Sequence, residues 1–347
     1  MPYFNAESLA ELIRQQLLIR GVNESSANHV ASSLIQTSLR GVDSHGINLF
    51  PHYCRAVEAG RINRNPRIKV LNTAVSTAVV DADHAFGHHA GAVAMDTAIG
   101  IAKDSGIGVA AVRNSTHFGA AAYFGLMATQ RGCIGLAFTN ADALVKASGS
   151  TESFFGTNPI CFTAPLENEE PFCLDMATSL VTWNKILNFR RDGKEIPVDW
   201  ACAPDGTAVI DPNLAVTLCP AGSYKGFGLG MMVDILCSVL TGGIISKDLK
   251  PMYKLPLDNS KRSISHFFMA LDIERFSNID IFRSSLQRMV DRIRALPPQY
   301  CNENVMVPGD PEKKCYSSRV LSGIPLDELK LGEFIELSTE FSEALVR

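Results

Sequence analysis

The spacing of apolar residues along the sequence changes at Pro66. Three segments before this residue carry apolar side chains at helical spacing: residues 7–20, 24–39 and about 49–59. After it, short runs of apolar and β-branched residues alternate with helical segments, a pattern typical of α/β proteins. This change predicts a small N-terminal helical unit, residues 1–65, attached to an α/β body.

The rest of the chain favours one large body over two separate domains. We expect strands at residues 68–71, 76–81, 106–113, 133–139, 160–165, 172–176, 265–273 and 305–307. We expect helices at residues 90–105, 120–130, 227–240, 279–296 and after Asp327. The apolar helix 227–240 is expected to be buried. Residues 66–243 then form the body, 244–262 a small inserted lobe, and 263–347 a return to the body with C-terminal helices.

Composition argues against several classes of partner. The 32 basic and 36 acidic residues give a net charge of −4 without a basic stripe, so we expect no nucleic acid partner. The apolar runs are too short to span a bilayer and the N-terminus lacks a signal-peptide pattern, so we expect a cytoplasmic protein without a membrane partner. The nine cysteines form no CxxC pair, which argues against a zinc site or a disulfide framework, and we expect no metal.

One glycine motif, Gly106–Ala111, fits the letters G-x-G-x-x-A. In a Rossmann unit such glycines follow a strand and open a helix, so that the pyrophosphate meets the helix N-terminus. Here they follow a predicted helix and open a predicted strand, which is the arrangement of a helix C-cap. The sequence therefore argues against a Rossmann phosphate loop.

A second glycine segment, Tyr224–Gly230, enters the apolar helix expected at 227–240. Backbone N–H groups, the helix dipole and Lys225 would together form an anion cradle. Alternatively, Gly226 and Gly230 permit close helix packing and Lys225 is merely solvated. The sequence leaves both interpretations open.

Two histidines lie at positions suited to active-site residues. His45 lies beside Ser44 in the glycine-bounded segment Arg40–Gly46, and His117 lies between a predicted strand and a predicted helix. Sites of α/β proteins are often built at such strand ends. An imidazole titrates near neutral pH and can serve as an acid or as a base. The alternative is that each ring only satisfies the backbone groups of its turn.

Five sequence blocks occur together and in order: Ser44–Gly46, Asn114–Gly119, Gly156–Pro159, Asp175–Ser179 and Tyr224–Gly226. In this combination the chain resembles the malate/L-lactate dehydrogenase family, which also includes sulfolactate, ureidoglycolate and diketogulonate dehydrogenases or reductases. The resemblance runs from about residue 5 to about residue 335, with Ser322–Leu326 as its late marker.

The resemblance implies a fold and a cofactor. Members of this family bind NAD(H) or NADP(H) on a non-Rossmann, largely antiparallel mixed sheet flanked by helices, and work as homodimers with active sites near the subunit interface. We therefore expect an α/β protein of this kind that binds NAD or NADP as a homodimer. The expected cofactor-binding residues are Asn140, Asp175, Met176, Ala177, Thr178, Lys225, Gly226, Gly309 and Asp310.

The resemblance also implies that His117 or His45 transfers the proton while the other, beside Ser44, orients the substrate. We favour His117 as the acid–base because a strand edge is a stiffer support than a turn. The expected substrate contacts are Arg40, Lys146, Thr157 and Asn158. The implied reaction is hydride transfer between nicotinamide and a small 2-hydroxy or 2-oxo acid. The alternatives are a cyclic imine (ketimine) reductase and a catalytically silent cofactor-binding relative.

The chain departs from the family at positions that bear on specificity. Many relatives carry an arginine suited to a substrate carboxylate where this chain has Leu49. Either Lys146 or Arg40 supplies the lost positive charge, or the substrate is not a simple 2-oxo carboxylate. A separate expected loop carries three cations, which form either a site for the 2′-phosphate of NADP or a solvated charged face: Arg190, Arg191 and Lys194.

Overall fold

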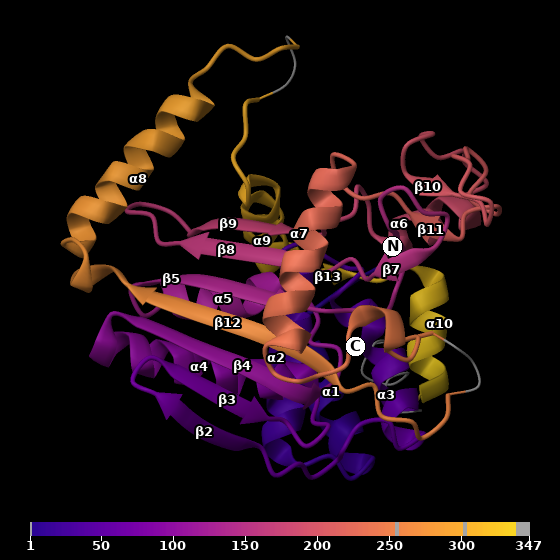
Figure 1. Cartoon of the computed structure of the whole chain (residues 1–347), viewed down its shortest axis with the longest axis horizontal. Helices are drawn as coiled ribbons and strands as arrows, with labels where there is room; N and C mark the ends of the chain where they lie inside the picture. Colours follow the sequence, from indigo (N-terminus) through magenta and orange to yellow (C-terminus); the bar gives the residue numbers. More distant parts are fainter. Residues whose placement is uncertain (1, 254–256, 301–303, 338–347) are drawn as a thin grey trace.

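The computed structural model, which describes residues 2–253, 257–300 and 304–337, is built around a seven-stranded sheet (Figure 1). In spatial order the strands are β2 (Lys69–Ala74), β3 (Thr77–Asp81), β4 (Ile107–Ser115), β12 (Ile264–Asp272), β5 (Cys133–Thr139), β8 (Ile160–Ala164) and β9 (Phe172–Met176). Only the β3–β4 pair of this sheet is parallel. The prediction of a largely antiparallel, non-Rossmann mixed sheet is confirmed.

Helices cover both faces of the sheet. Helices α4 (Gly87–Ser105) and α5 (Ala121–Thr129) pack on one face, where Phe268 of β12 lies in their core. The neighbouring residue Phe267 points to the other face, because side chains alternate along a strand, and packs under the helix that begins at Tyr224. The central strand is therefore buried from both sides.

That second helix differs from the prediction. Helix α7 (Tyr224–Asp234) continues as a π-helical turn (Ile235–Val239), and only one side of it is buried, through Val233 and Cys237. Its outer side chains are exposed in the single chain: Leu229, Met231, Met232, Ile235, Val239 and Leu240. The prediction of a buried helix was wrong because the helix lies on the outside of the sheet, and no further layer of the described residues covers it.

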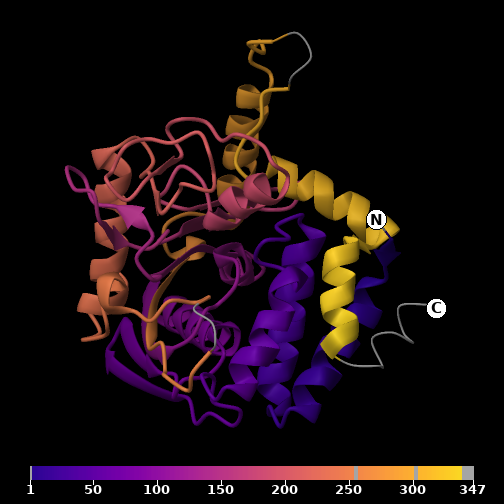
Figure 2. The same ribbon diagram turned by 90° about the vertical axis from the view of Figure 1, so that its right-hand side faces the viewer.

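The N-terminal helices form a unit with its own core. Helices α1 (Ala6–Ile19), α2 (Glu24–Leu39) and α3 (Phe50–Glu58) pack together, and a 3₁₀ turn (Ile47–Leu49) precedes α3. The end of the chain completes this unit. Strand β13 (Ile324–Pro325) pairs with β1 (Tyr3–Phe4), and α10 (Glu328–Leu337) lies beside the N-terminal helices in Figure 2, with Phe334 stacked on Phe50.

A smaller lobe with its own core was not predicted. It combines β6 (Val145–Lys146), β7 (Ser153–Phe155), β10 (Ala201–Cys202), β11 (Thr217–Leu218) and α6 (Trp183–Arg191). The described part of 244–262, where a lobe was expected, contains one 3₁₀ turn (Ser246–Asp248) and contacts the N-terminal unit instead. Met252 joins the core of that unit, and the Arg61 side chain donates to the Pro251 carbonyl.

Two further differences concern the C-terminal third. Helix α8 (Ile279–Arg294) is present as expected, but the strand expected at 305–307 is not formed, and helix α9 (Asp310–Ser322) was missed. No residue of α9 is fully buried, so it carries no apolar stripe from which it could be recognised.

The motif at Gly106 is a helix end, as expected. Helix α4 stops at Ser105, the Gly106 N–H donates to the Ala102 carbonyl, and the backbone of Gly106 has φ 89°. At Gly108 an added Cβ would lie 1.9 Å from the Ala98 carbonyl oxygen, so the second glycine allows β4 to pack directly against α4. None of the described helices is long and apolar enough to cross a membrane.

Candidate active site

The two histidines singled out in the sequence lie face to face. Their ring centroids are 5.8 Å apart and the ring planes differ by 28°. His45 comes from the turn after α2 in the N-terminal unit, and His117 follows β4 in the body. The turn that carries His45 is tightly packed, since a Cβ on Gly46 would lie 2.2 Å from the Ser38 hydroxyl. The pair therefore forms where the two units meet.

Neighbouring groups hold both rings. The Ser44 hydroxyl lies 3.0 Å from Nδ1 of His45, and the Tyr53 hydroxyl lies 2.7 Å from Nδ1 of His117. The Gly119 N–H also donates to Nδ1 of His117, at 3.3 Å. Because a backbone N–H can only donate, the neutral His117 ring accepts at Nδ1 and carries its proton on Nε2.

Tyr53 is a site residue that the sequence interpretation missed. It lies on α3, is 1% exposed, and packs the edge of its ring against His88 at a centroid distance of 5.0 Å. A buried tyrosine hydroxyl requires a hydrogen-bond partner, and His117 provides one. The sequence offers only one weak signal, a tyrosine in the helix that follows the His45 turn.

The surroundings of His45 and His117 contradict the expectation that both rings titrate near neutral pH. Burial lowers the pKa of His45 to about 4, and burial together with the nearby His45 and Arg262 holds the pKa of His117 well below its usual value. Both rings are therefore neutral at pH 7 in the chain alone. The expectation that they titrate near neutral pH does not hold without a bound charge.

A cavity of about 730 Å³ opens beside this pair. Its walls come from the end of α2, the start of α5, strand β9, the 306–309 segment and α9. Of the two rings, only His45 is part of the lining. The predicted site residues that line the cavity are Arg40, Ser44, His45, Thr157, Asp175, Ala177 and Gly309.

Asp175 presents a carboxylate to the cavity. It accepts the Ala122 N–H at the start of α5, at 2.8 Å. The surrounding protein raises its pKa to about 6, with a smaller contribution from Glu312, although the side chain can still be reached from the cavity. Gly309 lies opposite, with φ 96°, so close to the strand that an added Cβ would be 3.2 Å from the Cys173 backbone.

The other predicted residues lie outside the cavity lining. Three have side chains that hydrogen-bond to backbone inside the fold: Asn140 to Ile244 and Ser265, Asn158 to Ala141 and Gly230, and Thr178 to Thr157. Met176 pairs with Ile160 within the sheet, and Asp310 forms an ion pair with Arg294. These residues do not line the cavity in the single chain.

The segment at the start of α7 also lies away from the cavity. Lys225 is exposed, and a Cβ on Gly226 would lie 2.3 Å from the Ala221 carbonyl oxygen. Of the two interpretations left open by the sequence, close packing therefore accounts for Gly226 in this chain.

Of the candidate cations, some line the cavity and others do not. The Lys146 amino group donates to the Gly206 carbonyl in the smaller lobe, so Lys146 does not supply a charge to this cavity, whereas Arg40 lines it. Leu49 lies in the core of the N-terminal unit. Arg190 is bound to the Pro212 carbonyl and Arg191 to Asp192, on a helix that does not line the cavity.

Comparison with known proteins identifies the family. Residues 4–334 match the malate/L-lactate dehydrogenase family. The chain belongs to this family of oxidoreductases. It is 37% identical to the malate dehydrogenase of Pyrococcus abyssi over 343 residues, which cover 96% of this chain and 93% of that protein.

Solved structures of similar proteins share the fold. The malate dehydrogenase of Entamoeba histolytica superposes with a TM-score of 0.92 at 30% identity, covering 98% of both chains. The delta1-piperideine-2-carboxylate reductase of Pseudomonas syringae pvar. tomato superposes with a TM-score of 0.88 at 25% identity, covering 97% of this chain and 100% of that one. The same fold thus occurs in proteins named for different reductions.

Proposed function

We propose that the protein is an NAD(P)-dependent dehydrogenase that transfers hydride between nicotinamide and a small 2-hydroxy or 2-oxo acid. The observation that carries this proposal is the stacked His45–His117 pair beside a cavity of about 730 Å³. The residues of the cavity suit a dinucleotide. The Asp175 carboxylate, which lines the cavity, is an acceptor for ribose hydroxyls.

The protein's own part in the reaction is placement and proton transfer. Bound nicotinamide supplies or accepts the hydride. Once protonated on both nitrogens, His117 donates its Nε2 proton to the oxygen of the substrate carbonyl and returns to the neutral ring, and His45 with Ser44 orients the substrate. The Tyr53 hydroxyl can donate to Nδ1 of His117 or accept from it, so it holds the ring in either protonation state.

The low pKa values of the rings favour an anionic substrate. Reduction consumes one proton, yet both rings are neutral in the chain alone. A substrate carboxylate placed beside them raises their pKa values, because an opposite charge stabilises the protonated ring. Substrate binding is then coupled to the uptake of the required proton from solvent by one of the rings.

The reaction is tested by direct binding followed by turnover. Isothermal titration calorimetry with NADH and NADPH should detect at least one of the two, and a panel of pyruvate, oxaloacetate and a cyclic imino acid should show oxidation of that cofactor. If neither nucleotide binds, the dehydrogenase proposal fails. Binding without turnover of any substrate would instead support a catalytically silent relative.

A cyclic imine reductase is the second candidate. The P. syringae structure, named a delta1-piperideine-2-carboxylate reductase, has the same fold over nearly the whole chain. A higher kcat/KM for the cyclic imino acid than for both oxo acids would favour this candidate.

We also propose a homodimer. The apolar outer side of α7 is exposed in the single chain, and burying such a patch against a second copy is favourable. Replacing Met231 by Glu should therefore reduce the mass measured by light scattering during size-exclusion chromatography from that of a dimer to that of a monomer. A wild-type monomer would contradict the proposal.

A further inference from the structure

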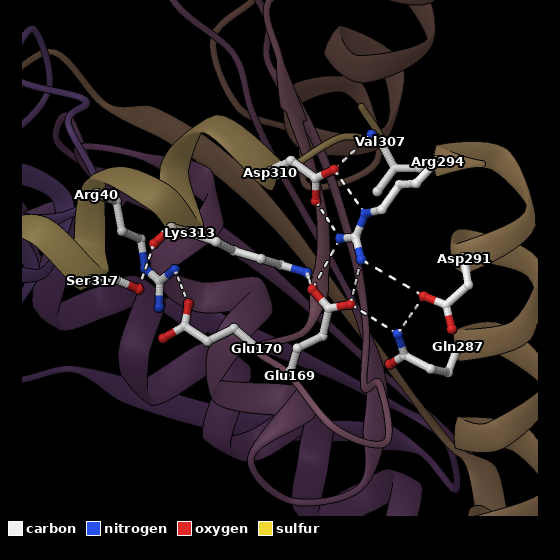
Figure 3. A network of polar contacts seen from close by, with 10 residues as sticks. All are labelled: Arg40, Glu169, Glu170, Gln287, Asp291, Arg294, Val307, Asp310, Lys313 and Ser317. Carbon is white, nitrogen blue, oxygen red and sulfur yellow. Dashed lines mark hydrogen bonds and ion pairs between the residues drawn. The ribbon is translucent and has the colours of Figure 1, made fainter. Parts of the chain in front are cut away.

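The turn between β8 and β9 carries two adjacent carboxylates, and each binds a cation of the cavity wall (Figure 3). Glu170 forms an ion pair with Arg40, with 2.6 Å between Oε2 and Nη1, and the Arg40 guanidinium lies 4.7 Å from the centre of the Tyr316 ring. Glu169 forms an ion pair with Lys313 at 2.7 Å and also binds Arg294 through both oxygens. The two cations are thus already neutralised.

The charge of the whole cavity is therefore unfavourable for an additional phosphate. Among the described residues that line it, Arg40 and Lys313 are the only arginine and lysine, and both are paired. The lining also contains Asp175 and Glu312, for which no ion pair is found within the described part of the chain. His45 is neutral at pH 7. A phosphate dianion would meet two carboxylates without a compensating cation.

Glu170 and Ala177 both line the cavity, and strand β9 (Phe172–Met176) runs between them. An extended chain rises about 3.3 Å per residue, so Glu170 and Ala177 lie roughly 20 Å apart. The chain that follows Ala177 contacts the His45 turn, where the Asn184 side chain donates to the Ser44 carbonyl. If the nicotinamide lies beside His45, the adenosine half extends toward Arg40 and Glu170.

We propose that Glu170 determines cofactor choice: by holding Arg40 and adding its own negative charge, it makes the cavity select NAD(H) over NADP(H). This inference rests on the proposed dehydrogenase function. The 2′-phosphate of NADP needs a cation, preferably an arginine that binds it through two N–H groups. Arg40 has the correct chemistry, and its pairing with Glu170 prevents it from serving.

The test compares the affinities of the folded full-length protein for NADH and NADPH, measured by isothermal titration calorimetry. We expect the wild type to bind NADH about ten times more tightly than NADPH, since one charged hydrogen bond corresponds to about that factor. Glu170→Gln should strengthen NADPH binding about tenfold and leave NADH binding within about threefold. Adding Arg40→Gln to this variant should abolish the gain.

Two controls isolate the role of the carboxylate. Glu167 is exposed in the same turn, so Glu167→Gln makes the same charge change and should alter neither affinity. Glu170→Asp keeps the charge and should keep the preference for NADH. Equal wild-type affinities for the two nucleotides would overturn the inference, even if Glu170→Gln failed to fold. So would a Glu170→Gln variant with an unchanged ratio of affinities. Failure to bind either nucleotide would instead contradict the dehydrogenase function itself.

Discussion

The two ends of the cavity are built on opposite electrostatic principles. At the histidine end, His45, His117 and Tyr53 are enclosed, hydrogen-bonded and uncharged at pH 7. At the other end, Glu169 and Glu170 are charged and bound to cations, and the pKa of Glu169 is lowered to about 2, mainly by its hydrogen bonds to Arg294. The histidine end is thus neutral at pH 7, whereas the other end holds paired charges.

Replacing the histidines should have the largest effect on catalysis. His117→Ala should lower kcat by about 100-fold to 10,000-fold, because a positioned acid–base group contributes that much. His45→Ala should act mainly on KM if this ring orients the substrate. Steady-state kinetics of both variants decides the assignment. A His117→Ala variant with full kcat, together with a His45→Ala variant without it, would reverse the two roles.

Acid should destabilise the fold through the buried histidines rather than through the charged carboxylates. His88 is fully buried, neither of its ring nitrogens has a hydrogen-bond partner among the described residues, and burial lowers its pKa to about 3. The unfolded chain takes up protons near pH 6.5 whereas the folded one does not, so stability is present above pH 6.5 and is lost as the pH falls toward 4. Glu169 remains ionised throughout this range. Melting temperatures measured between pH 7.5 and 4 should therefore fall steadily.

A matched variant localises this acid effect. His88→Leu removes the buried imidazole, so the loss of melting temperature between pH 7.5 and pH 5 should be smaller than in the wild type. A variant that lost as much as the wild type would show that other groups cause the acid sensitivity.

Removing the Tyr53 hydroxyl should have a smaller effect. Tyr53→Phe keeps the ring packing but leaves Nδ1 of His117 without its shorter hydrogen bond. We expect kcat to fall about tenfold to a hundredfold, with KM nearly unchanged and the acid limb of the pH profile of kcat displaced. An equal loss in kcat and in melting temperature, without a change in the pH profile, would indicate that the hydroxyl is only structural.

The smallest change is expected at the charged end. Glu169→Gln weakens the contacts to Arg294 and Lys313, which are partly exposed, so the free energy of unfolding should fall by about 1 kcal/mol. Urea denaturation should show this difference shrinking at high salt, because salt screens exposed charges. A difference that does not depend on salt would mean that packing rather than charge holds this turn in place.

Local patterns predicted the elements better than the contacts between them. Strands such as Cys133–Thr139 and Phe172–Met176 were predicted at the residues where they occur, because their apolar runs are bounded by turn residues. The proximity of His45 and His117 followed only from family resemblance, and their low pKa values depend on burial that no local pattern encodes. The sequence interpretation could also not pair Arg40 with Glu170, since 130 positions separate them.

The place of β12 in the sheet affects how the chain folds during synthesis. This strand, Ile264–Asp272, lies between β4 and β5, which are made more than 120 residues earlier. During synthesis both older strands have an edge without its final neighbour until residue 272 has emerged, and open strand edges invite pairing with other chains. Interrupted synthesis before that point would leave two half-sheets that cannot join, so we expect truncated chains to aggregate rather than to accumulate as a folded N-terminal fragment.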